Sequence, residues 1–122
     1  MQYILLIYDD EATWGQMSDE ERGKVMQEYF AYTQDLRNTG QFVAGDALQP
    51  TQTAKTVRSQ GGERVVTDGP FAETKEQLGG YYIVDVETED DALAWAAKIP
   101  SARFGKIEVR PVMVYDREGA TA

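Results

Sequence analysis

Two residue types with distinctive chemistry, cysteine and histidine, are absent from all 122 positions of the sequence. Without cysteine the chain has no disulfide, no thiolate nucleophile and no cysteine-bound zinc or iron–sulfur centre. Without histidine it lacks the side chain best suited to proton transfer near neutral pH and the commonest ligand of transition metals. Any acid–base chemistry must therefore rely on Asp, Glu, Lys or Tyr. No calcium-loop spacing of Asp, Asn, Glu and Gly occurs either, so we expect no metal and no cofactor.

Positive charge is also scarce, because 12 Lys and Arg residues stand against 21 Asp and Glu, for a net charge of −9. A chain this acidic repels DNA, RNA and anionic membrane surfaces at long range, so we expect no partner of these kinds. No apolar run approaches the ~20 residues that span a bilayer. The first ten residues lack the basic opening and the small-residue cleavage site of a signal peptide. These features predict a cytoplasmic protein.

The length suits one domain with a single core. We expect that domain to cover residues 1–115, followed by a loose tail from Asp116 to Ala122. Apolar periodicity and turn signals predict a series of strands and helices along it. In order, these are a strand Tyr3–Tyr8, a helix from about Asp19 to Thr39, a strand Phe42–Leu48, a hairpin of Thr53–Ser59 and Arg64–Thr67 around Gly61-Gly62, a strand Gly80–Val86, a helix Thr88–Ile99 and a strand Lys106–Val114.

Both predicted helices have clear start signals. Ser18 and Glu21 match a capping box, and Thr88 is followed by three acidic residues that favour a first helical turn. Each helix also has an apolar face at helical spacing. The predicted apolar residues are Val25, Met26, Tyr29, Tyr32, Thr33 and Leu36 in the first helix, and Leu93, Trp95, Ala96 and Ile99 in the second.

This order of elements predicts an α+β fold, a ferredoxin-like βαββαβ sandwich with an inserted β-hairpin. Two helices would cover one face of the sheet. The strand Tyr3–Tyr8, however, is apolar on both faces, so the second face also needs a cover. Closed two-fold dimers are the commonest oligomers, and we therefore expect a homodimer that forms through the sheet faces.

The densest chemistry lies in the segment Asp68-Gly69-Pro70-Phe71-Ala72-Glu73-Thr74-Lys75-Glu76, which combines turn residues with four ionisable groups. This signature segment (Asp68–Glu76) resembles the signature of the DGPF branch of the YCII-related family. The similarity continues, in the same order, through Tyr3-Ile4-Leu5-Leu6-Ile7-Tyr8, Ala44-Gly45-Asp46-Ala47-Leu48-Gln49-Pro50, Leu78-Gly79-Gly80-Tyr81-Tyr82 and Ile107-Glu108-Val109-Arg110-Pro111-Val112.

The resemblance implies a dimeric α/β barrel, in which two ferredoxin-like subunits pack sheet to sheet, with a cleft in each subunit near the signature segment. The wider family includes small-molecule enzymes built around a His–Asp pair, and relatives are fused to or lie beside other enzymes and sigma factors. This chain has no histidine, so only the aspartate half of that pair has a match, in Asp68. The resemblance therefore says more about the fold of this chain than about its function.

Within the signature segment, Asp68 and Glu73 are the candidate functional residues. A partly buried Asp68 carboxylate could act as an acid or base, and the alternative is that it only hydrogen-bonds the turn backbone, as Asp before Gly commonly does. Glu73 could contact a substrate or form an exposed ion pair of small value. Both alternatives stay open at this stage.

Strand alternation adds three candidates outside that segment. Arg110 and Glu108 would face away from the helices, where a buried Arg110 needs a carboxylate from a ligand, from Glu108 or from Asp46. Tyr81 would offer a cleft hydroxyl beside Asp68, or simply pack in a core or interface.

The sequence thus favours a protein that binds a small polar or anionic molecule in a cleft beside Asp68-Gly69-Pro70-Phe71, with Asp68 as acid or base and with Tyr81, Arg110, Glu73 and Asp46 as ligand contacts. The alternative is a non-catalytic sensor or interaction module. Such a module would use its dimer surface or the predicted hairpin to bind a transcription regulator such as a sigma factor. A third hypothesis is that the signature segment only stabilises the fold.

Overall fold

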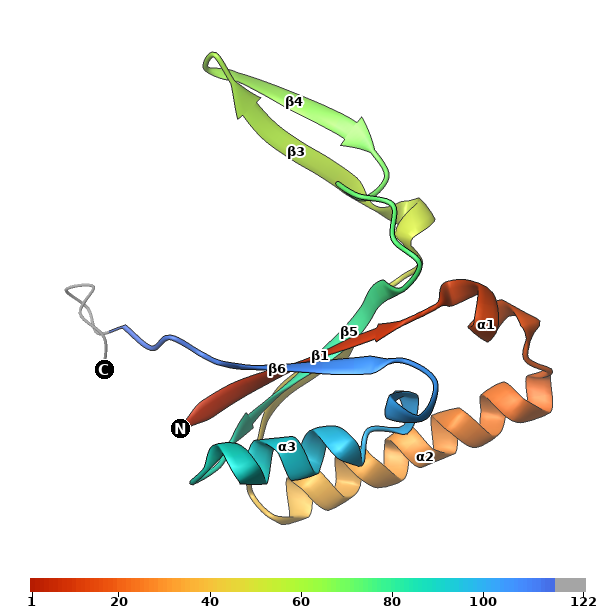
Figure 1. Ribbon diagram of the computed structural model, residues 1–122, viewed down its shortest axis with the longest axis vertical. Coiled ribbons are helices and arrows are strands. Elements are labelled where there is room, and N and C mark those ends of the chain that lie inside the picture. Colours follow the sequence, from red (N-terminus) through yellow and green to blue (C-terminus); the bar gives the residue numbers. More distant parts are fainter. Residues whose placement is uncertain (116–122) are drawn as a thin grey trace.

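A computed structural model describes residues 1–115, which form a four-stranded sheet, helices on one of its faces and a separate hairpin (Figure 1). The strands are β1 (Gln2–Asp9), β2 (Phe42–Ala47), β3 (Lys55–Gln60), β4 (Glu63–Asp68), β5 (Gln77–Asp85) and β6 (Lys106–Pro111). The helices are α1 (Glu11–Gln16), α2 (Asp19–Asn38) and α3 (Glu89–Ala97), with 3-10 turns η1 (Thr51–Thr53) and η2 (Pro100–Arg103). The predicted tail from Asp116 to Ala122 lies outside the described residues.

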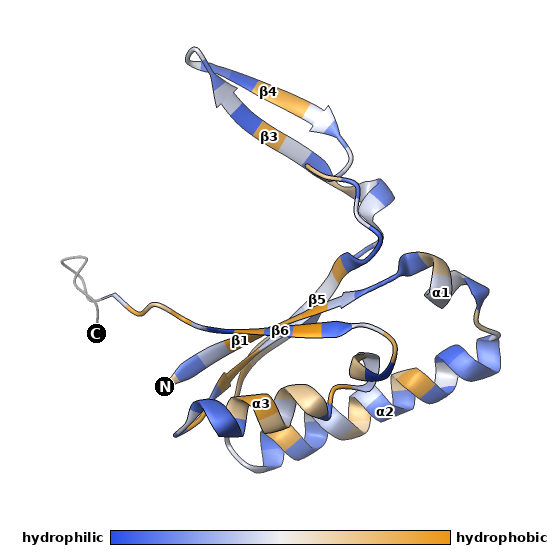
Figure 2. Cartoon of the chain, viewed as in Figure 1, coloured by the Kyte–Doolittle hydropathy of each residue, from blue (hydrophilic) through white to orange (hydrophobic). Residues whose placement is uncertain are grey.

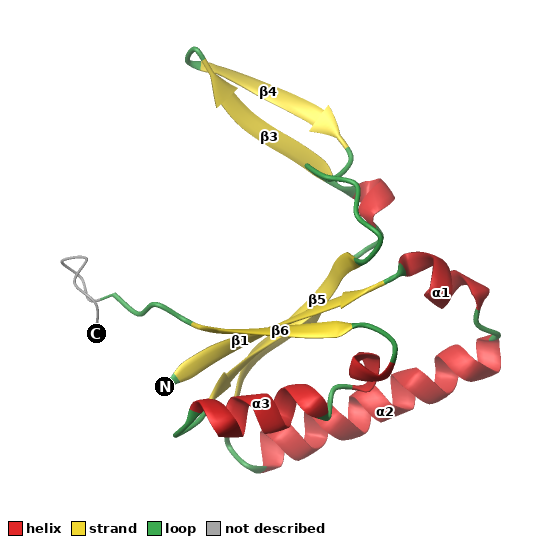
Figure 3. Ribbon diagram, viewed as in Figure 1, coloured by secondary structure: helices red, strands yellow, loops and turns green. Residues whose placement is uncertain are grey.

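The sheet has the strand order β2-β5-β1-β6, and all its neighbouring strands are antiparallel. Helix α2 connects β1 to β2 across β5, and α3 connects β5 to β6 across β1, so two βαβ units interleave (Figure 3). This arrangement confirms the predicted ferredoxin-like α+β fold, with β3 and β4 inserted between β2 and β5. The dimeric barrel stays a prediction.

The core lies between the sheet and the helices. Alternate residues of β1, Tyr3, Leu5 and Ile7, are buried on the helix side, and Leu5 is 0% exposed. The residues between them, such as Ile4 and Leu6, lie on the opposite face and are only partly buried. The sheet therefore has one face covered by helices and one open face, as the sequence pattern predicted. The core residues that complete the helix side include Tyr32, Leu36, Tyr82, Val84, Val86, Ala92, Ala96 and Ile99.

The capping predictions are confirmed. The Ser18 Oγ accepts a hydrogen bond from the Glu21 backbone N–H at 3.1 Å, and Thr88 caps α3 in the same manner through Asp91. Two predicted core positions are wrong, because Met26 is 43% exposed and Leu93 47% exposed. A helix on a sheet buries only one stripe of its surface, and these two side chains lie outside it.

Several element boundaries differ from those predicted. The last strand ends at Pro111 rather than Val114, although the Val112 N–H still donates to the Gln2 carbonyl at 2.9 Å. The six-residue helix α1 was not predicted, because it buries no residue and so has no apolar stripe. Its start is fixed by Asp10, whose carboxylate accepts the Ala12 N–H at 2.9 Å.

The hairpin of β3 and β4 rises from one end of the sheet, on the side away from α2 and α3 (Figure 1). Gly61 and Gly62 form its turn with φ of +59° and +82°, values that glycine adopts without strain. At its base, the Gly69 N–H donates to the Ala54 carbonyl at 2.8 Å, and the Thr56 hydroxyl donates to the Gly69 carbonyl at 2.8 Å. These bonds fix where the signature segment begins.

None of the helices in residues 1–115 combines the length and the apolar character that crossing a membrane requires.

Candidate functional site

A shallow polar pocket of about 440 Å³ lies where β1 ends and α1 begins. The signature segment forms one wall, while α1 and η1 form the other. Its lining residues are Glu11, Thr51, Gln52, Gly69, Pro70, Ala72, Glu73, Thr74 and Gln77. The two charged residues among them, Glu11 and Glu73, are both acidic.

Glu11 is the residue that holds this pocket together. Its carboxylate accepts hydrogen bonds from the Thr51 backbone N–H and from the Thr51 hydroxyl, both at 2.8 Å. Its backbone N–H donates to the Gln77 side-chain oxygen at 3.0 Å, and the Gln77 amide donates to the Thr74 carbonyl at 2.5 Å. Three segments distant in sequence thus meet at Glu11, η1 through its carboxylate and β5 through its backbone N–H.

Beside this pocket, a small polar cluster of Asp9, Ser101 and Tyr29 lies on the helix side of the sheet. The Tyr29 hydroxyl and the Ser101 Oγ are 2.5 Å apart, and Ser101 is only 4% exposed. Burial raises the pKa of the half-buried Asp9 carboxyl, helped by the negative charges of Glu11 and Glu76 and opposed by a hydrogen bond with Ser101. Burial likewise raises the pKa of Tyr29. A carboxyl that keeps its proton to higher pH is suited to proton transfer.

The glycine at position 105 allows the chain to close around Asp9, while Gly79 leaves ordinary contact distance on the other side. A Cβ added at Gly105 would lie 2.8 Å from the Asp9 Cβ and closer still to the Tyr8 carbonyl oxygen. A Cβ at Gly79 would lie 3.6 Å from the Asp9 Oδ1. The start of β6 therefore approaches the end of β1 more closely than any side chain at position 105 would permit.

The sequence alone did not single out Asp9. Its burial could not be predicted, because Ser101 and Tyr29 come from η2 and α2 and meet it only in the folded chain. The available signal was position: a carboxylate at the last residue of a buried strand.

The two candidates of the signature segment are placed differently. Glu73 lines the pocket. Asp68, at the end of β4, does not line it, and its 88% exposed side chain forms an ion pair with Lys55 across the hairpin. An acid–base role for Asp68 stays a prediction.

The other candidates lie on the open face of the sheet. The Tyr81 hydroxyl donates to the Asp46 carboxylate at 2.9 Å, and this bond raises the pKa of Tyr81. Arg110 lies across β1 from them, opposite Ile4, with its side chain exposed. Within residues 1–115, no ion pair joins Arg110 to Glu108 or Asp46, and no hydrogen bond joins Tyr81 to Asp68. The structure thus brings Tyr81 and Asp46 together and leaves Asp68 apart from them.

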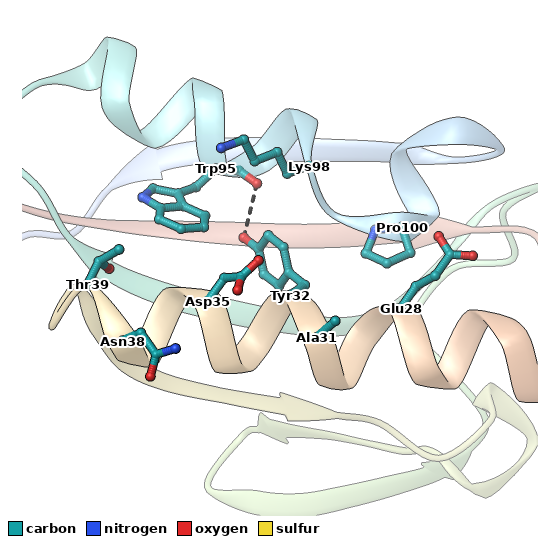
Figure 4. Close-up of a pocket in the computed structure, with 9 residues that line it drawn as sticks. All are labelled: Glu28, Ala31, Tyr32, Asp35, Asn38, Thr39, Trp95, Lys98 and Pro100. Carbon is teal, nitrogen blue, oxygen red and sulfur yellow. Dashed lines mark hydrogen bonds between the residues drawn. The ribbon is translucent and has the colours of Figure 1, made fainter.

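A larger groove of about 620 Å³ lies between α2 and α3 (Figure 4). The Tyr32 hydroxyl donates to the Trp95 carbonyl at 3.0 Å, the dashed line in Figure 4, and the Lys98 Nζ lies 5.1 Å from the centre of the Trp95 ring. The Tyr32 hydroxyl thus links α2 to α3. In this groove Glu28 pairs with Arg103, and the hydrogen bonds from Arg103 lower the pKa of the Glu28 carboxyl, whereas burial raises the pKa of Asp9. We therefore take the β1 end as the candidate site. In residues 1–115 no three acidic side chains converge as metal ligands.

Comparison with known proteins agrees with this fold. The family model of the YCII-related domain matches residues 1–116. An uncharacterized protein of Rhizobium meliloti (strain 1021) is 40% identical over 117 residues, 94% of each chain. Among solved structures, the 5-chloro-2-hydroxyhydroquinone dehydrochlorinase TftG of Burkholderia phenoliruptrix AC1100, in complex with 2,5-dihydroxybenzoquinone, is similar with a TM-score of 0.55 and 14% identity, covering 98% of this chain and 99% of that one. At that identity the likeness concerns the fold alone.

Proposed function

The chain belongs to the YCII-related family, and we propose that it binds a small polar molecule in the pocket between Glu11 and the signature segment. The observation that carries this proposal is the convergence of α1, η1 and the signature segment on one polar pocket next to a half-buried carboxyl, Asp9. Concave sites with a few fixed polar groups and a titratable residue of shifted pKa are where ligands commonly bind.

The charges of the pocket narrow the ligand class. Glu11 and Glu73 line it, and neither Lys nor Arg is among its lining residues. An anion would be repelled there, so we propose an uncharged polar or a cationic ligand rather than an anionic one. A ring compound is a reasonable first probe, since a dehydrochlorinase of the same fold binds 2,5-dihydroxybenzoquinone.

If the bound molecule reacts, carboxylate acid–base catalysis is the chemistry that these residues support. Asp9 does not line the pocket itself, but it adjoins Glu11 and Glu76 and burial raises its pKa. It is the proposed proton donor or acceptor for a ligand that extends from the pocket toward it. The exposed Asp68 could take part only if a ligand or a second chain covered it. Either carboxyl would work without a histidine partner.

Ligand-induced thermal stabilisation across hydroxylated ring compounds, amines and carboxylates tests this proposal. We expect stabilisation by members of the first or second group and loss of that effect in Glu73→Gln. Glu87→Gln, the same substitution on an exposed residue beyond the other end of β5, is the matched control and should retain it. Stabilisation by carboxylates alone, or equal responses of the two variants, would contradict the proposed ligand class and pocket.

We also propose that the open face of the sheet forms a homodimer interface. Ile4, Leu6 and Ile83 lie side by side there, since Ile4 pairs with Ile83 across β1 and β5. Such an apolar surface on a sheet is stabilised by a second layer. Sedimentation equilibrium should show a dimer for the parent chain and a monomer for Leu6→Asp. A monomeric parent would overturn this part of the proposal and leave the ligand pocket untouched.

A further inference from the structure

The hairpin of β3 and β4 is the part of the chain whose shape the proposed pocket does not explain. Within residues 1–115 its two strands make their main contacts with each other. An isolated two-stranded hairpin is marginally stable in water, and independent stability requires a third strand or a packed layer. The hairpin should therefore gain stability from a surface outside its own chain.

The hairpin carries an apolar pair suited to such a contact. Val57 and Val66 are directly opposite each other in the ladder, and they are 60% and 51% exposed. Figure 2 shows an orange, apolar band on β3 and another on β4, on a hairpin that is otherwise mostly hydrophilic or intermediate in colour. Cross-strand pairs of β-branched residues are the side chains that a packed layer covers most favourably.

The direction in which the hairpin projects indicates which molecule it contacts. The hairpin rises on the side of the sheet opposite α2 and α3 (Figure 1), which is the side of the open face. A second molecule seated on that face would lie alongside the hairpin. The hairpin cannot itself cover the open face of its own chain, because it points away from the sheet.

The charge of the hairpin also favours a second copy of this chain as its partner. The hairpin contains Lys55, Arg58 and Arg64 against Glu63 and Asp68, so it is net positive within a chain of net charge −9. In residues 1–115 neither Arg58 nor Arg64 forms an ion pair. A basic hairpin on an acidic protein is complementary to another copy of that protein.

We infer that the hairpin is an arm that packs against a second copy of this chain through the Val57–Val66 pair. The inference rests on the proposed dimer through the open face and adds to it a second contact, made at the edge of the interface. Because Gly69 and Pro70 follow the hairpin directly and line the pocket, the arm contact would also fix one wall of the ligand site.

The test compares neighbouring residues on opposite faces of the hairpin. Val66→Glu places a charge in the proposed contact, whereas Thr67→Glu places the same charge on the other face of the same strand. We expect sedimentation equilibrium to show dimerisation weakened about tenfold or more by Val66→Glu and little changed by Thr67→Glu. Equal dimer affinities of the two variants would overturn the arm contact, even if Leu6→Asp still abolished the dimer.

The absence of cysteine permits a second, direct measurement. Ser59→Cys provides a single thiol near the hairpin tip for a photoreactive crosslinker, in an equal mixture of ¹⁵N-labelled and unlabelled protein. We expect crosslinked peptides that pair one isotope with the other. Crosslinks confined to one isotope would overturn the arm contact, and a parent chain that is monomeric would overturn both the arm and the dimer.

Discussion

The body of the molecule and its hairpin both contain strands with apolar residues, yet they bury these residues very differently. In the sheet, Leu5 and Val84 are fully buried, whereas in the hairpin Val57 is 60% exposed. The same contrast holds for carboxylates, since Asp9 is half-buried among polar partners and Asp68 is exposed beside Lys55. The local sequence pattern thus specifies that a segment forms a strand. The layer packed against that strand decides whether its residues belong to the core, to a site or to the surface.

The largest expected difference is in the free energy of unfolding when an apolar side chain is truncated in each region. Leu5→Ala should reduce the free energy of unfolding by about 2–5 kcal/mol, because it leaves a cavity in a packed core. Val57→Ala should change it by less than about 0.5 kcal/mol. Urea unfolding followed by circular dichroism measures both, in the Leu6→Asp background so that dimerisation does not contribute. A comparable loss for Val57→Ala would show that the hairpin packs within its own chain.

The next largest difference between the two regions is expected from glycine-to-alanine substitutions, one in each region. Gly105→Ala forces a Cβ against Asp9 and the Tyr8 carbonyl, and overpacking of this kind costs about 1–3 kcal/mol. Gly61→Ala meets no atom within 4 Å but has a φ of +59°, which costs about 1 kcal/mol. Hydrogen exchange should locate the first effect at β1 and β6 and the second in the hairpin alone. Destabilisation of the whole chain by Gly61→Ala would contradict the view that the hairpin unfolds independently of the sheet.

The half-buried Asp9 should make stability depend on pH. The Asp9 pKa is raised above its ordinary value of 3.8, so the folded chain binds more protons than the unfolded chain between that value and the raised one. The contribution of Asp9 to stability therefore falls as pH rises through this window. Asp9→Asn removes that fall, so the variant should gain stability relative to the parent chain as pH rises.

Unfolding measured at a series of pH values, with Asp68→Asn as the matched control, tests this. Parallel stability curves for the parent and Asp9→Asn would show that Asp9 is not buried as described.

The smallest expected effect is that of the ion pair at the hairpin base. Lys55→Met removes the partner of Asp68, and because both side chains are mostly exposed the loss should be about 0–1 kcal/mol. Thermal unfolding at low and high salt measures it, and the difference should shrink as salt increases. A larger, salt-insensitive loss would indicate that this pair is covered by a second chain, and would sharpen the inference about the arm.

Local signals predicted the fold well. The capping residues Ser18 and Thr88, the apolar run Tyr3–Tyr8 and the glycine pair of the hairpin each act over a few residues, so they can be recognised from the sequence alone. Positions at the border of an apolar stripe, such as Met26, were misassigned because helical spacing gives the direction of a side chain but not the width of the surface that covers it.

The candidate site was predicted only in part. The signature segment was singled out for its dense chemistry, and Glu73 lines a pocket there, while a functional role for it stays a prediction. The sequence also directed attention to Asp68 rather than Asp9. A carboxylate's chemistry depends on its burial and neighbours, and for Asp9 those neighbours are supplied by α2 and η2.

By itself the sequence determined the order of strands and helices, the ferredoxin-like fold, the open apolar face and the absence of any thiol or imidazole chemistry, because these follow from residue type and short-range periodicity. Only the tertiary structure decided that Glu11, Thr51 and Gln77 converge on one pocket, that Asp9 is enclosed beside Ser101, and that Asp68 lies on a projecting hairpin. Burial and convergence are properties of segments far apart in the chain, and they exist only once the sheet has brought those segments together.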